Sequence, residues 1–391
     1  MLLEGLKVVE MATWIAGPGC AGVMADWGAE VIKVEAPDGD AIRSFYPDTA
    51  EIPGNPIFAM ENRGKKGVVL DLRKPEGRAA MLTLLKQADV FVTNLRPGRL
   101  RKLGLDYETV KAQAPRLIYS MVTGYGLQGP EVDNPAFDIT AFWSRTGAAR
   151  ATIPPDQEPF PSRPGFGDHT TALATLSATL AALHERQTTG KGRLVEASLI
   201  RAGAYAIGWD LSLQLRYGHV VTAQPRDDRP SAISGFFRTG DGRYVVIVPR
   251  SVDCFTNMMI AVDRPEILAD ERYQFPTDDL EIIREVRAII DEGFARMTLE
   301  EAGQRLTECD LAWAPMATLE ELANSEMARL AGCFETVADG WGGSFRAVAA
   351  PARFPEGQPK VGRPAPKLGE HTREVLEAAG LRPDEIDAVC G

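Results

Sequence analysis

The chain has 391 residues, of which 45% are hydrophobic and 25% are charged. This composition supplies a sizeable core and leaves room for two or three domains. The formal net charge of −11 and the pI of about 5.1 exclude a protein whose whole surface binds nucleic acid.

Cysteine and histidine usage also limits the possible functions. The five cysteines and four histidines are scattered, without CxxC, HxH or HExxH spacing. This pattern predicts a reducing cytoplasmic environment and no protein-held metal. No apolar run reaches the roughly 18 residues of a membrane span, and no basic leader precedes the first predicted strand. We therefore expect a soluble cytoplasmic protein that does not enter a membrane.

Predicted strands alternate with predicted helices along the first half of the chain. A helix is expected up to about residue 27, and others at 75–87, 99–103, 107–113, 170–186 and 198–217. The strands are expected at 6–11, 30–35, 68–72, 89–93, 117–122 and 194–197. This alternation predicts an α/β fold with a mostly parallel sheet. Residues 36–58 are predicted to form a loop.

A glycine-rich motif follows the first strand. Residues 17–22 match GxGxxG, and Glu35 lies about where a ribose-binding acid is expected in a dinucleotide site. Pro18, however, removes one N–H group from the turn that would hold the phosphates. Two interpretations are open, a dinucleotide site or a tight strand-to-helix turn without a dinucleotide, and we favour the second.

Residues 61–105 form a basic segment within an acidic chain. They contain eleven Lys or Arg residues and four Asp or Glu residues, a net charge of +7. A solvated basic face is one explanation. The other is a patch that binds a small polyanion, for which phosphates are suited.

Residues 163–171 (RPGFGDHTT) place one carboxylate, Asp168, between a glycine-rich loop and an Ala/Leu-rich helix. Asp is a favoured helix N-cap, and by itself the nonapeptide favours that role. The alternative is a nucleophile, since glycines allow a ligand to approach closely and helix N-terminal amides stabilise negative charge.

The second half of the chain is predicted to contain a smaller domain. We assign residues 1–217 to a large domain, 218–231 to a linker, 232–314 to a small α+β domain and 315–391 to a segment that completes the large domain. A hairpin is expected around residues 236–248. Helices are expected at 251–262, 279–297, 299–308 and 315–332, with a final helix at 370–379.

Eight short motifs, spread over essentially the whole chain, together resemble the family III CoA-transferases. This family includes formyl-CoA and carnitine CoA-transferases and the α-methylacyl-CoA racemases. The motifs are AGP at 16–18, WGAEVIKVE at 27–35, LDLRKPEG at 70–77, NLRPG at 94–98, GYG at 124–126, GFGD at 165–168, TGKG at 189–192 and PAPKLGEHT at 364–372.

The resemblance implies a fold that periodicity does not reveal. It implies a Rossmann-like large domain built from both chain ends, a small inserted α+β domain, and two subunits interlocked as a homodimer. The GxGxxG motif would then belong to a CoA-binding fold. CoA and acyl-CoA would be substrates, with no cofactor bound permanently.

The resemblance also implies that Asp168 is the catalytic nucleophile. It would attack an acyl-CoA thioester to form a mixed anhydride and then an aspartyl-CoA thioester. Amides near Gly165, Gly167 or Gly126 would bind the oxyanion, and Phe137 would border the substrate. For His169, two roles stay open: it orients Asp168 or contacts substrate, or it faces solvent at the start of the helix.

The CoA-binding residues implied by the family pattern fall largely in or beside the basic segment. Arg73 and Lys102 belong to that segment, while the three leucines have ordinary core packing as an alternative explanation. The full set is Trp14, Leu70, Arg73, Asn94, Leu95, Lys102 and Leu103.

Two departures from the family pattern bear on the reaction. Phe137 occupies the position of the racemases' histidine, which favours transfer over racemisation, and Ile15 replaces a glutamine of formyl-CoA transferase. The Gly-Asp-His step at 167–169 is similar to that of the 2-hydroxyacyl and aryllactate CoA-transferases. We therefore predict CoA transfer to a small carboxylic acid, with hydroxy and aryl acids as candidates. The alternatives are an acyl-CoA racemase or isomerase, and a non-catalytic CoA- or dinucleotide-binding protein.

Overall fold

The computed structural model describes residues 2–45, 54–357 and 363–391. Its contacts divide the chain into two compact units. The first contains Met1–Ile153, Glu158–Thr222 and Arg329–Gly391, and the second contains Pro154–Gln157 and Ala223–Ala328. The first unit is therefore assembled from both ends of the chain.

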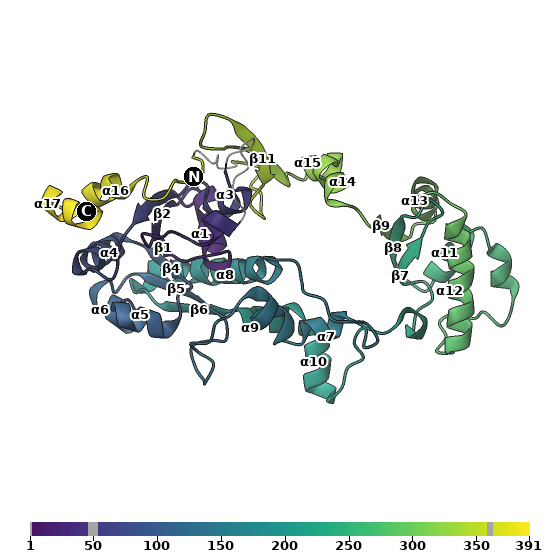
Figure 1. The fold of residues 1–391 in the computed structure, drawn as a ribbon. Helices are drawn as coiled ribbons and strands as arrows, with labels where there is room; N and C mark the ends of the chain where they lie inside the picture. Colours follow the sequence, from purple (N-terminus) through teal and green to yellow (C-terminus); the bar gives the residue numbers. More distant parts are fainter. Residues whose placement is uncertain (1, 46–53, 358–362) are drawn as a thin grey trace. The chain divides into compact units, whose positions relative to one another are not determined.

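Six parallel strands form the sheet of the first unit (Figure 1). They are β1 (Lys7–Met11), β2 (Glu30–Glu35), β3 (Lys66–Val69), β4 (Val90–Thr93), β5 (Ile118–Thr123) and β6 (Leu194–Ser198). Their spatial order is β3-β2-β1-β4-β5-β6, and every neighbouring pair runs parallel. The α/β fold with a parallel sheet is thus confirmed. The chain reverses direction across the sheet between β1 and β4, where ligand sites of such sheets lie.

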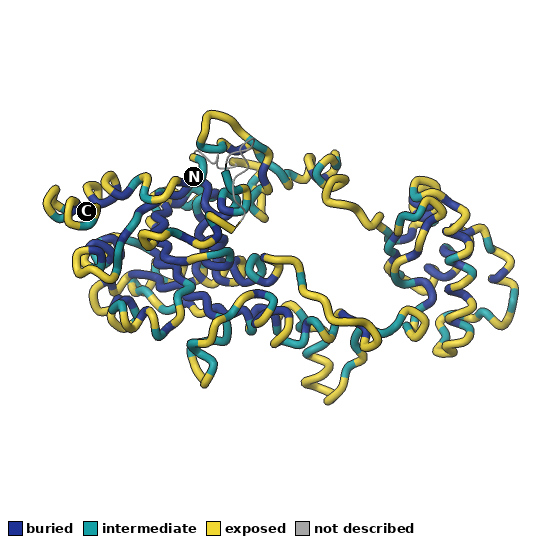
Figure 2. Tube along the Cα trace, in the orientation of Figure 1, coloured by how far each residue is buried: buried dark blue, intermediate teal, exposed yellow. Residues whose placement is uncertain are grey.

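Alternate residues of each strand pack into two separate hydrophobic cores, one on each face of the sheet. Val8 packs on one face with α1 (Ala16–Asp26) and α8 (Phe166–Thr189). Val9 packs on the other face with α4 (Pro75–Gln87), α5 (Pro97–Leu103), α6 (Tyr107–Gln113) and the C-terminal α16 (Thr372–Ala378) and α17 (Pro383–Cys390). The strands accordingly form the darkest part of the first unit in Figure 2. Because both faces are covered, the strands are buried almost throughout, and the charged side chains buried on β1 and β2 are held in ion pairs.

The glycines of the GxGxxG motif lie inside α1 and not in a turn before it. The helix begins at Ala16, so Gly17, Gly19 and Gly22 are all helical and buried. A Cβ atom on Gly22 would lie 2.6 Å from the backbone oxygen of Glu61 in α3 (Pro56–Asn62). The motif therefore allows two helices to pack closely. A strand-to-helix turn exists, but its predicted position was wrong. The turn ends at Ile15 and the helix begins at Ala16, before the first glycine of the motif.

Four charged side chains are buried together beneath the start of α1. Glu10 on β1 accepts from Lys33 Nζ on β2 at 2.9 Å and from Lys65 Nζ at 2.5 Å. Asp40 accepts from the same Lys33 at 3.0 Å. All four are at most 2% exposed. We call this set the buried charge cluster. Its two cations and two anions balance, which is the condition under which buried charges are tolerated.

The second unit has its own sheet and core. Strands β7 (Gly235–Arg238), β8 (Tyr244–Val248) and β9 (Ala312–Pro315) pair antiparallel. They pack with α11 (Cys254–Ala261), α12 (Leu280–Ala295) and α13 (Leu299–Glu308) around Phe237, Ile290 and Phe294. The predicted hairpin is confirmed, since Phe236 pairs with Val246. Short 3₁₀ segments are η2 (Arg226–Asp228) and η3 (Pro265–Ala269).

Several predicted elements differ in extent. The helix expected at 315–332 is two helices, α14 (Leu319–Asn324) and α15 (Glu326–Leu330), because Ser325 is extended between them. The helix expected at 198–217 is divided at Ile207 into α9 (Leu199–Ala206) and α10 (Gly208–Tyr217). The helix expected last is followed by α17, which Pro383 begins at its first position.

The remaining elements of the first unit are short helices and one hairpin. The predicted loop at 36–58 contains α2 (Ile42–Phe45) and α3, while its residues 46–53 lie outside the described part of the chain. A π-helix, η1 (Asp138–Ser144), and α7 (Ala148–Thr152) precede α8. A hairpin of β10 (Phe334–Ala338) and β11 (Ser344–Val348) lies near the C-terminus. No helix in the described ranges is both long and apolar enough to cross a membrane.

The buried charge cluster should dominate the stability of the first unit. Replacing Glu10 by Gln would leave Lys33 and Lys65 without their shared carboxylate, and we expect unfolding free energy to fall by roughly 3–5 kcal/mol. Chemical denaturation of the parent and of Glu10→Gln measures this. Asp384→Asn, which removes an exposed pair with Arg382, is the control and should leave the midpoint unchanged. Equal midpoints for all three proteins would contradict the prediction.

Candidate active site

Asp168 is the third residue of α8, and it does not cap the helix. The N-cap is Gly165, whose φ of +86° lies in the left-handed region that favours glycine. The predicted helix start at Thr170 was four residues late, because Phe166 and Gly167 extend the helix toward the loop. The cap interpretation is therefore wrong. Among the described residues no group donates a hydrogen bond to the Asp168 carboxylate, which leaves both oxygens open to another molecule.

The surroundings of Asp168 disfavour its charged form. Burial, followed by repulsion from Asp138 and a smaller contribution from Glu61, raises the pKa of Asp168 to about 7, while neighbouring His169 acts in the opposite direction. A carboxylate with such a pKa is less well solvated than a carboxylate in water. Once ionised, it is therefore a better base and a better nucleophile.

Asp138 anchors the loop that precedes Asp168. One of its oxygens accepts from the Gly165 N–H group at 2.8 Å, and the other accepts from Ile139 at 2.7 Å. Asp138 is only 5% exposed. The N–H group of Gly126 likewise donates to Thr123 Oγ1 at 2.9 Å. Two of the three glycine amides predicted to bind an oxyanion are thus already engaged within the protein.

The third glycine, Gly167, packs tightly against a neighbouring element, and its N–H group is not engaged by the described residues. A Cβ atom there would lie 2.5 Å from Phe142 Cγ, so only glycine permits α8 to pack this closely on η1. No acceptor for the N–H groups of Gly167 and Asp168 occurs in the described part of the chain. These two amides stand at the positive end of the α8 dipole and could stabilise a negative charge beside Asp168.

His169 pairs with a glutamate that the sequence did not single out. Its Nε2 atom lies 2.8 Å from Glu61 Oε1 on α3. The Glu61 side chain is 4% exposed, whereas that of His169 is 41% exposed. The hydrogen bond to Glu61 raises the pKa of His169. His169 is therefore a half-buried, bonded group. Glu61 went unnoticed because no local pattern marks it and its partner is 108 positions away in the chain.

A strained turn links the N-terminal strand to this region. Trp14 has a φ of +66°, which is unusual for a bulky residue. Asp40 accepts from its N–H group at 3.2 Å, and Asn94 bonds both backbone groups of Thr13. The Trp14 ring meets Phe45 and Phe137 edge to face, at 5.3 and 5.6 Å between centroids. These contacts hold the turn in one conformation.

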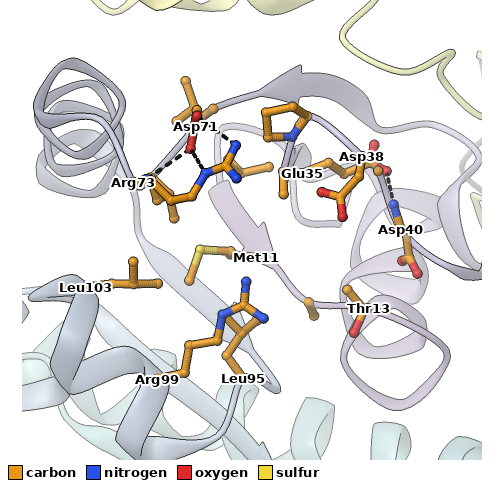
Figure 3. Close-up of a pocket in the computed structure, with 17 residues that line it drawn as sticks. Met11, Thr13, Glu35, Asp38, Asp40, Asp71, Arg73, Leu95, Arg99 and Leu103 are labelled. Carbon is orange, nitrogen blue, oxygen red and sulfur yellow. Dashed lines mark hydrogen bonds and ion pairs between the residues drawn. The ribbon is translucent and has the colours of Figure 1, made fainter.

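An open cleft of about 310 Å³ lies on the other side of this turn, at the carboxyl ends of the strands (Figure 3). It contains four of the predicted CoA-binding residues, Leu70, Arg73, Leu95 and Leu103. Trp14, Asn94 and Lys102 do not line it; Trp14 and Asn94 flank the lining residues Thr13 and Leu95, and Lys102 is exposed on α5.

Two arginines stand on opposite walls of the cleft. Arg73 is held by Asp71 through a 2.8 Å bond from Nε and is 81% exposed at its side chain. Arg99, which was missed as an individual residue, reaches into the cleft from α5 (Figure 3). Its membership of the basic segment was the available signal. The basic segment thus supplies cationic groups to a cavity, beyond any solvated face it forms.

The cleft is connected to Asp168 through the turn at residues 13–15. Thr13 lines the cleft. Ile15 Cδ1 lies 3.4 Å from the position of a Cβ atom on Gly165, the cap of α8. A molecule bound along this turn would therefore reach from the cleft to the start of α8.

The geometry argues against a dinucleotide site. Both oxygens of Glu35 accept from Arg43, at 2.8 Å from Nε and 2.7 Å from Nη2, and one also accepts from the Asp40 N–H group at 3.0 Å, so this carboxylate is held by the protein's own groups. In the described ranges no three His, Cys, Asp or Glu side chains are placed to hold a metal ion.

Comparison with known proteins identifies the family. The profile of CoA-transferase family III matches residues 3–372. The chain belongs to CoA-transferase family III. The family prediction and the prediction of an enzyme of this class are confirmed, and CoA thioesters are the substrates of the class.

Similar proteins cover nearly the entire length of this CoA-transferase. It is 35% identical to the (R)-2-hydroxy-4-methylpentanoate CoA-transferase of Clostridioides difficile, over 99% of this chain and 98% of that protein. It is 32% identical to the cinnamoyl-CoA:phenyllactate CoA-transferase of Clostridium sporogenes, over 99% and 95%. A CaiB/BaiF family protein from Brucella suis has a similar structure, with a TM-score of 0.84, 29% identity and coverage of 96% and 99%.

The raised pKa of Asp168 should be visible in the stability of this CoA-transferase. A carboxyl whose pKa is about 7 in the folded protein and 3.8 ordinarily contributes stability that is complete below about pH 4 and lost as the pH rises through 7. The Asp168→Asn variant has no carboxyl group at this position, so it does not lose stability in this way as the pH rises. We expect the variant to melt at a higher temperature than the parent at about pH 8, with the difference disappearing near pH 4. A variant less stable than the parent at the higher pH would contradict the burial argument.

Proposed function

We propose that this enzyme transfers CoA from an acyl-CoA to a carboxylic acid, with Asp168 as the covalent nucleophile. The observation that carries this proposal is a half-buried carboxylate without a hydrogen-bond donor among the described residues, next to two unengaged amides at the start of α8. Such an arrangement supplies the nucleophile and the oxyanion donors of an acyl transfer.

The reaction then follows as four balanced exchanges. An Asp168 oxygen forms a bond to the thioester carbonyl carbon, and the C–S bond breaks with its electron pair leaving on the CoA thiolate. The thiolate attacks the aspartyl carbonyl of the mixed anhydride and releases the first acid as its carboxylate. The acceptor carboxylate attacks the aspartyl-CoA thioester and regenerates the thiolate. The thiolate then attacks the acceptor's carbonyl carbon in the second mixed anhydride, which forms the new acyl-CoA and releases Asp168 as its carboxylate. No net proton is consumed.

The N–H groups of Gly167 and Asp168 would bind the oxyanion of these steps. A negative charge develops on a carbonyl oxygen in each exchange, and preorganised donors stabilise it most in a partly buried site. Gly165 and Gly126 would instead support the loops. Phe137 would border the acyl group.

CoA would bind in the cleft at the carboxyl ends of the strands. The phosphates would meet Arg73 and Arg99, with Lys102 on the nearby exposed face, and the leucines would contact the adenine. The pantetheine arm would then follow the turn held by Asn94 and pass Trp14 toward Asp168. Leu70, at 1% exposure, serves the core as well as the cleft wall.

The acceptor would be an apolar hydroxy or aryl acid. The aromatic rings that surround the Trp14 turn include two that are exposed, Phe45 at 57% and Phe137 at 52%. Such rings favour a branched or aromatic acyl chain over a small polar acid. The two relatives named above act, by their names, on hydroxymethylpentanoate and phenyllactate, which fits this class.

The enzyme would work in the cytoplasm as an interlocked homodimer. The first unit would be the Rossmann-like large domain and the second the inserted small domain. Helix α10 buries none of its residues and exposes Trp209, Leu215 and Tyr217 at 84, 78 and 66%. An apolar face of this kind is typical of a surface that another chain covers.

Racemisation is the less favoured alternative. A two-base racemase needs a second group beside Asp168 to move a proton, and the position carries Phe137. The adjacent Asp138 is engaged by two backbone amides. A purely CoA-binding protein would retain its CoA affinity and show no activity to lose when Asp168 is replaced.

Covalent catalysis can be tested by trapping. Mixing the enzyme with an acyl-CoA and hydroxylamine should convert the activated aspartyl ester into a hydroxamate, detected as a mass gain that maps to Asp168. Asp168→Asn should show no gain and lose CoA transfer entirely while it binds CoA like the parent. Residual transfer within tenfold of the parent would remove Asp168 from the nucleophile's role.

The cleft can be tested through its salt dependence. For the double variant Arg73→Ala, Arg99→Ala, we expect the Kd for CoA to rise roughly tenfold at an ionic strength of about 0.02 M and roughly twofold at about 0.5 M, because salt screens exposed charges. The matched control is Arg373→Ala, Arg382→Ala, which removes the same charge from the C-terminal helices. If both double variants weaken CoA equally, net charge and not the cleft is responsible.

A further inference from the structure

The contact between His169 and Glu61 has features of a functional pair. The two residues are 108 positions apart in the chain, and their side chains meet at 2.8 Å. His169 directly follows the nucleophile on the first turn of α8, while Glu61 projects from α3. The imidazole therefore contacts a buried carboxylate and belongs to the residue next to Asp168.

The fold creates a specific place for the Glu61 side chain. A Cβ atom on Gly19 of α1 would lie 2.8 Å from Glu61 Oε2, and one on Gly22 would lie 2.6 Å from the Glu61 backbone oxygen. Glycine at these positions lets α3 approach α1 until Glu61 reaches His169. The GxGxxG motif, which serves no dinucleotide here, is thereby explained.

Glu61 has no other direct hydrogen-bond partner at its side chain among the described residues. Lys65 and Arg63 act on it electrostatically. However, Lys65 donates to Glu10, Pro18 and Asn62, and Arg63 donates to Asp26 and Val348. A carboxylate that is 4% exposed needs a charged or hydrogen-bonding partner, and His169 is the one that contacts it.

Three ionisable groups face Asp168 from the elements packed around it. They are Asp138 from η1, Glu61 from α3, and His169 from α8 itself. Three carboxyl groups, Glu61, Asp168 and Asp138, act in turn on His169. Among the charged groups of the described residues that act on Asp168, His169 is the one that lowers its pKa. Without it, the repulsion from Asp138 and Glu61 would favour the protonated nucleophile, which cannot attack a thioester.

We propose that Glu61 and His169 form a positioning pair that holds an imidazolium beside Asp168 and so keeps the nucleophile ionised during turnover. Glu61 orients the ring and maintains its charge, and the ring acts on Asp168 through space. Both are positioning residues, because neither forms a bond to the substrate. This proposal rests on the proposed function of Asp168. A structural latch between α3 and α8 is the competing explanation, and it would affect stability alone.

The first test compares two replacements of His169 that differ in charge. His169→Gln removes the cation, whereas His169→Lys keeps one within reach of Glu61. We measure kcat/KM from about pH 5.5 to 9, using phenyllactate and whichever acyl-CoA labels Asp168 most strongly with hydroxylamine. For the Gln variant, the loss relative to the parent should be roughly three- to tenfold larger at about pH 6 than at about pH 8.5, because fewer nucleophiles are ionised. The Lys variant should follow the parent's pH dependence.

Two controls keep the result specific. His184→Gln removes an exposed histidine from the same helix and should leave the pH profile unchanged. Because His169 is half exposed, its replacements should fold, and thermal melts verify this. Equal losses for His169→Gln at both pH values, or a Lys variant that behaves like the Gln variant, would overturn the proposal in favour of a latch.

The second test addresses Glu61 without reference to activity. NMR titration of ¹³C-labelled histidines in the full-length protein reports the pKa of His169 directly, and Glu61→Gln should lower it. An unchanged titration would show that Glu61 does not maintain the charge. Failure of the proposed function is distinguishable, since it would appear as an absence of hydroxamate on Asp168 in the parent enzyme, whatever the titration shows.

Discussion

The buried charge cluster of Glu10, Lys33, Asp40 and Lys65 is the constraint on which the rest of the site depends. Its members also bond the backbone around them: Lys33 donates to the Ala12 carbonyl at 3.1 Å and Lys65 to the Pro18 carbonyl at 2.9 Å. Unpaired, any one of these charges would be costly to bury, so each depends on the others. Their bonds connect the residue after β1 with the start of α1.

The turn at Trp14 is a direct consequence. Asp40 bonds Lys33 with one oxygen and the Trp14 N–H group with the other. A left-handed conformation at a tryptophan is strained and persists only where its surroundings determine it. This strained turn contacts the cleft through Thr13 and the loop before Asp168 through Ile15. We therefore regard the charge cluster as the foundation of the path along which a CoA thioester would extend.

Close packing that only glycine allows then shapes the electrostatics of Asp168. Gly167 brings α8 against Phe142 of η1, whose first residue is Asp138, and Gly19 and Gly22 bring α1 against α3 and Glu61. Each contact places a carboxylate near Asp168, and each added charge disfavours its ionised form. Burial makes the carboxylate reactive but also difficult to ionise. His169 offsets part of that effect, which is why its partner Glu61 has functional interest.

The extent to which the sequence predicted this protein depends on how local each feature is. The six strands were found to within two or three residues, since alternation of apolar runs with turns is a local signal. Asp168 was singled out first by its place between a glycine-rich loop and a helix, and Arg73 and Leu95 through family motifs; the roles of all three stay predictions. The charges in the strand at 30–35 gave no sign of burial, because Lys33 is neutralised by residues from two other segments. Glu61 and Arg99 were missed for a similar reason: neither has a local pattern.

Sequence alone therefore determined the alternation of strands and helices in the first unit and the family, and it singled out Asp168. Tertiary structure decided that the GxGxxG glycines lie within a helix, that Gly165 and not Asp168 caps α8, and that Arg99 shares the cleft with Arg73. It also decided that Glu61 meets His169 across 108 residues of chain. Periodicity and capping depend on neighbours in sequence, whereas the burial and charge state of a side chain depend on the residues that folding brings around it.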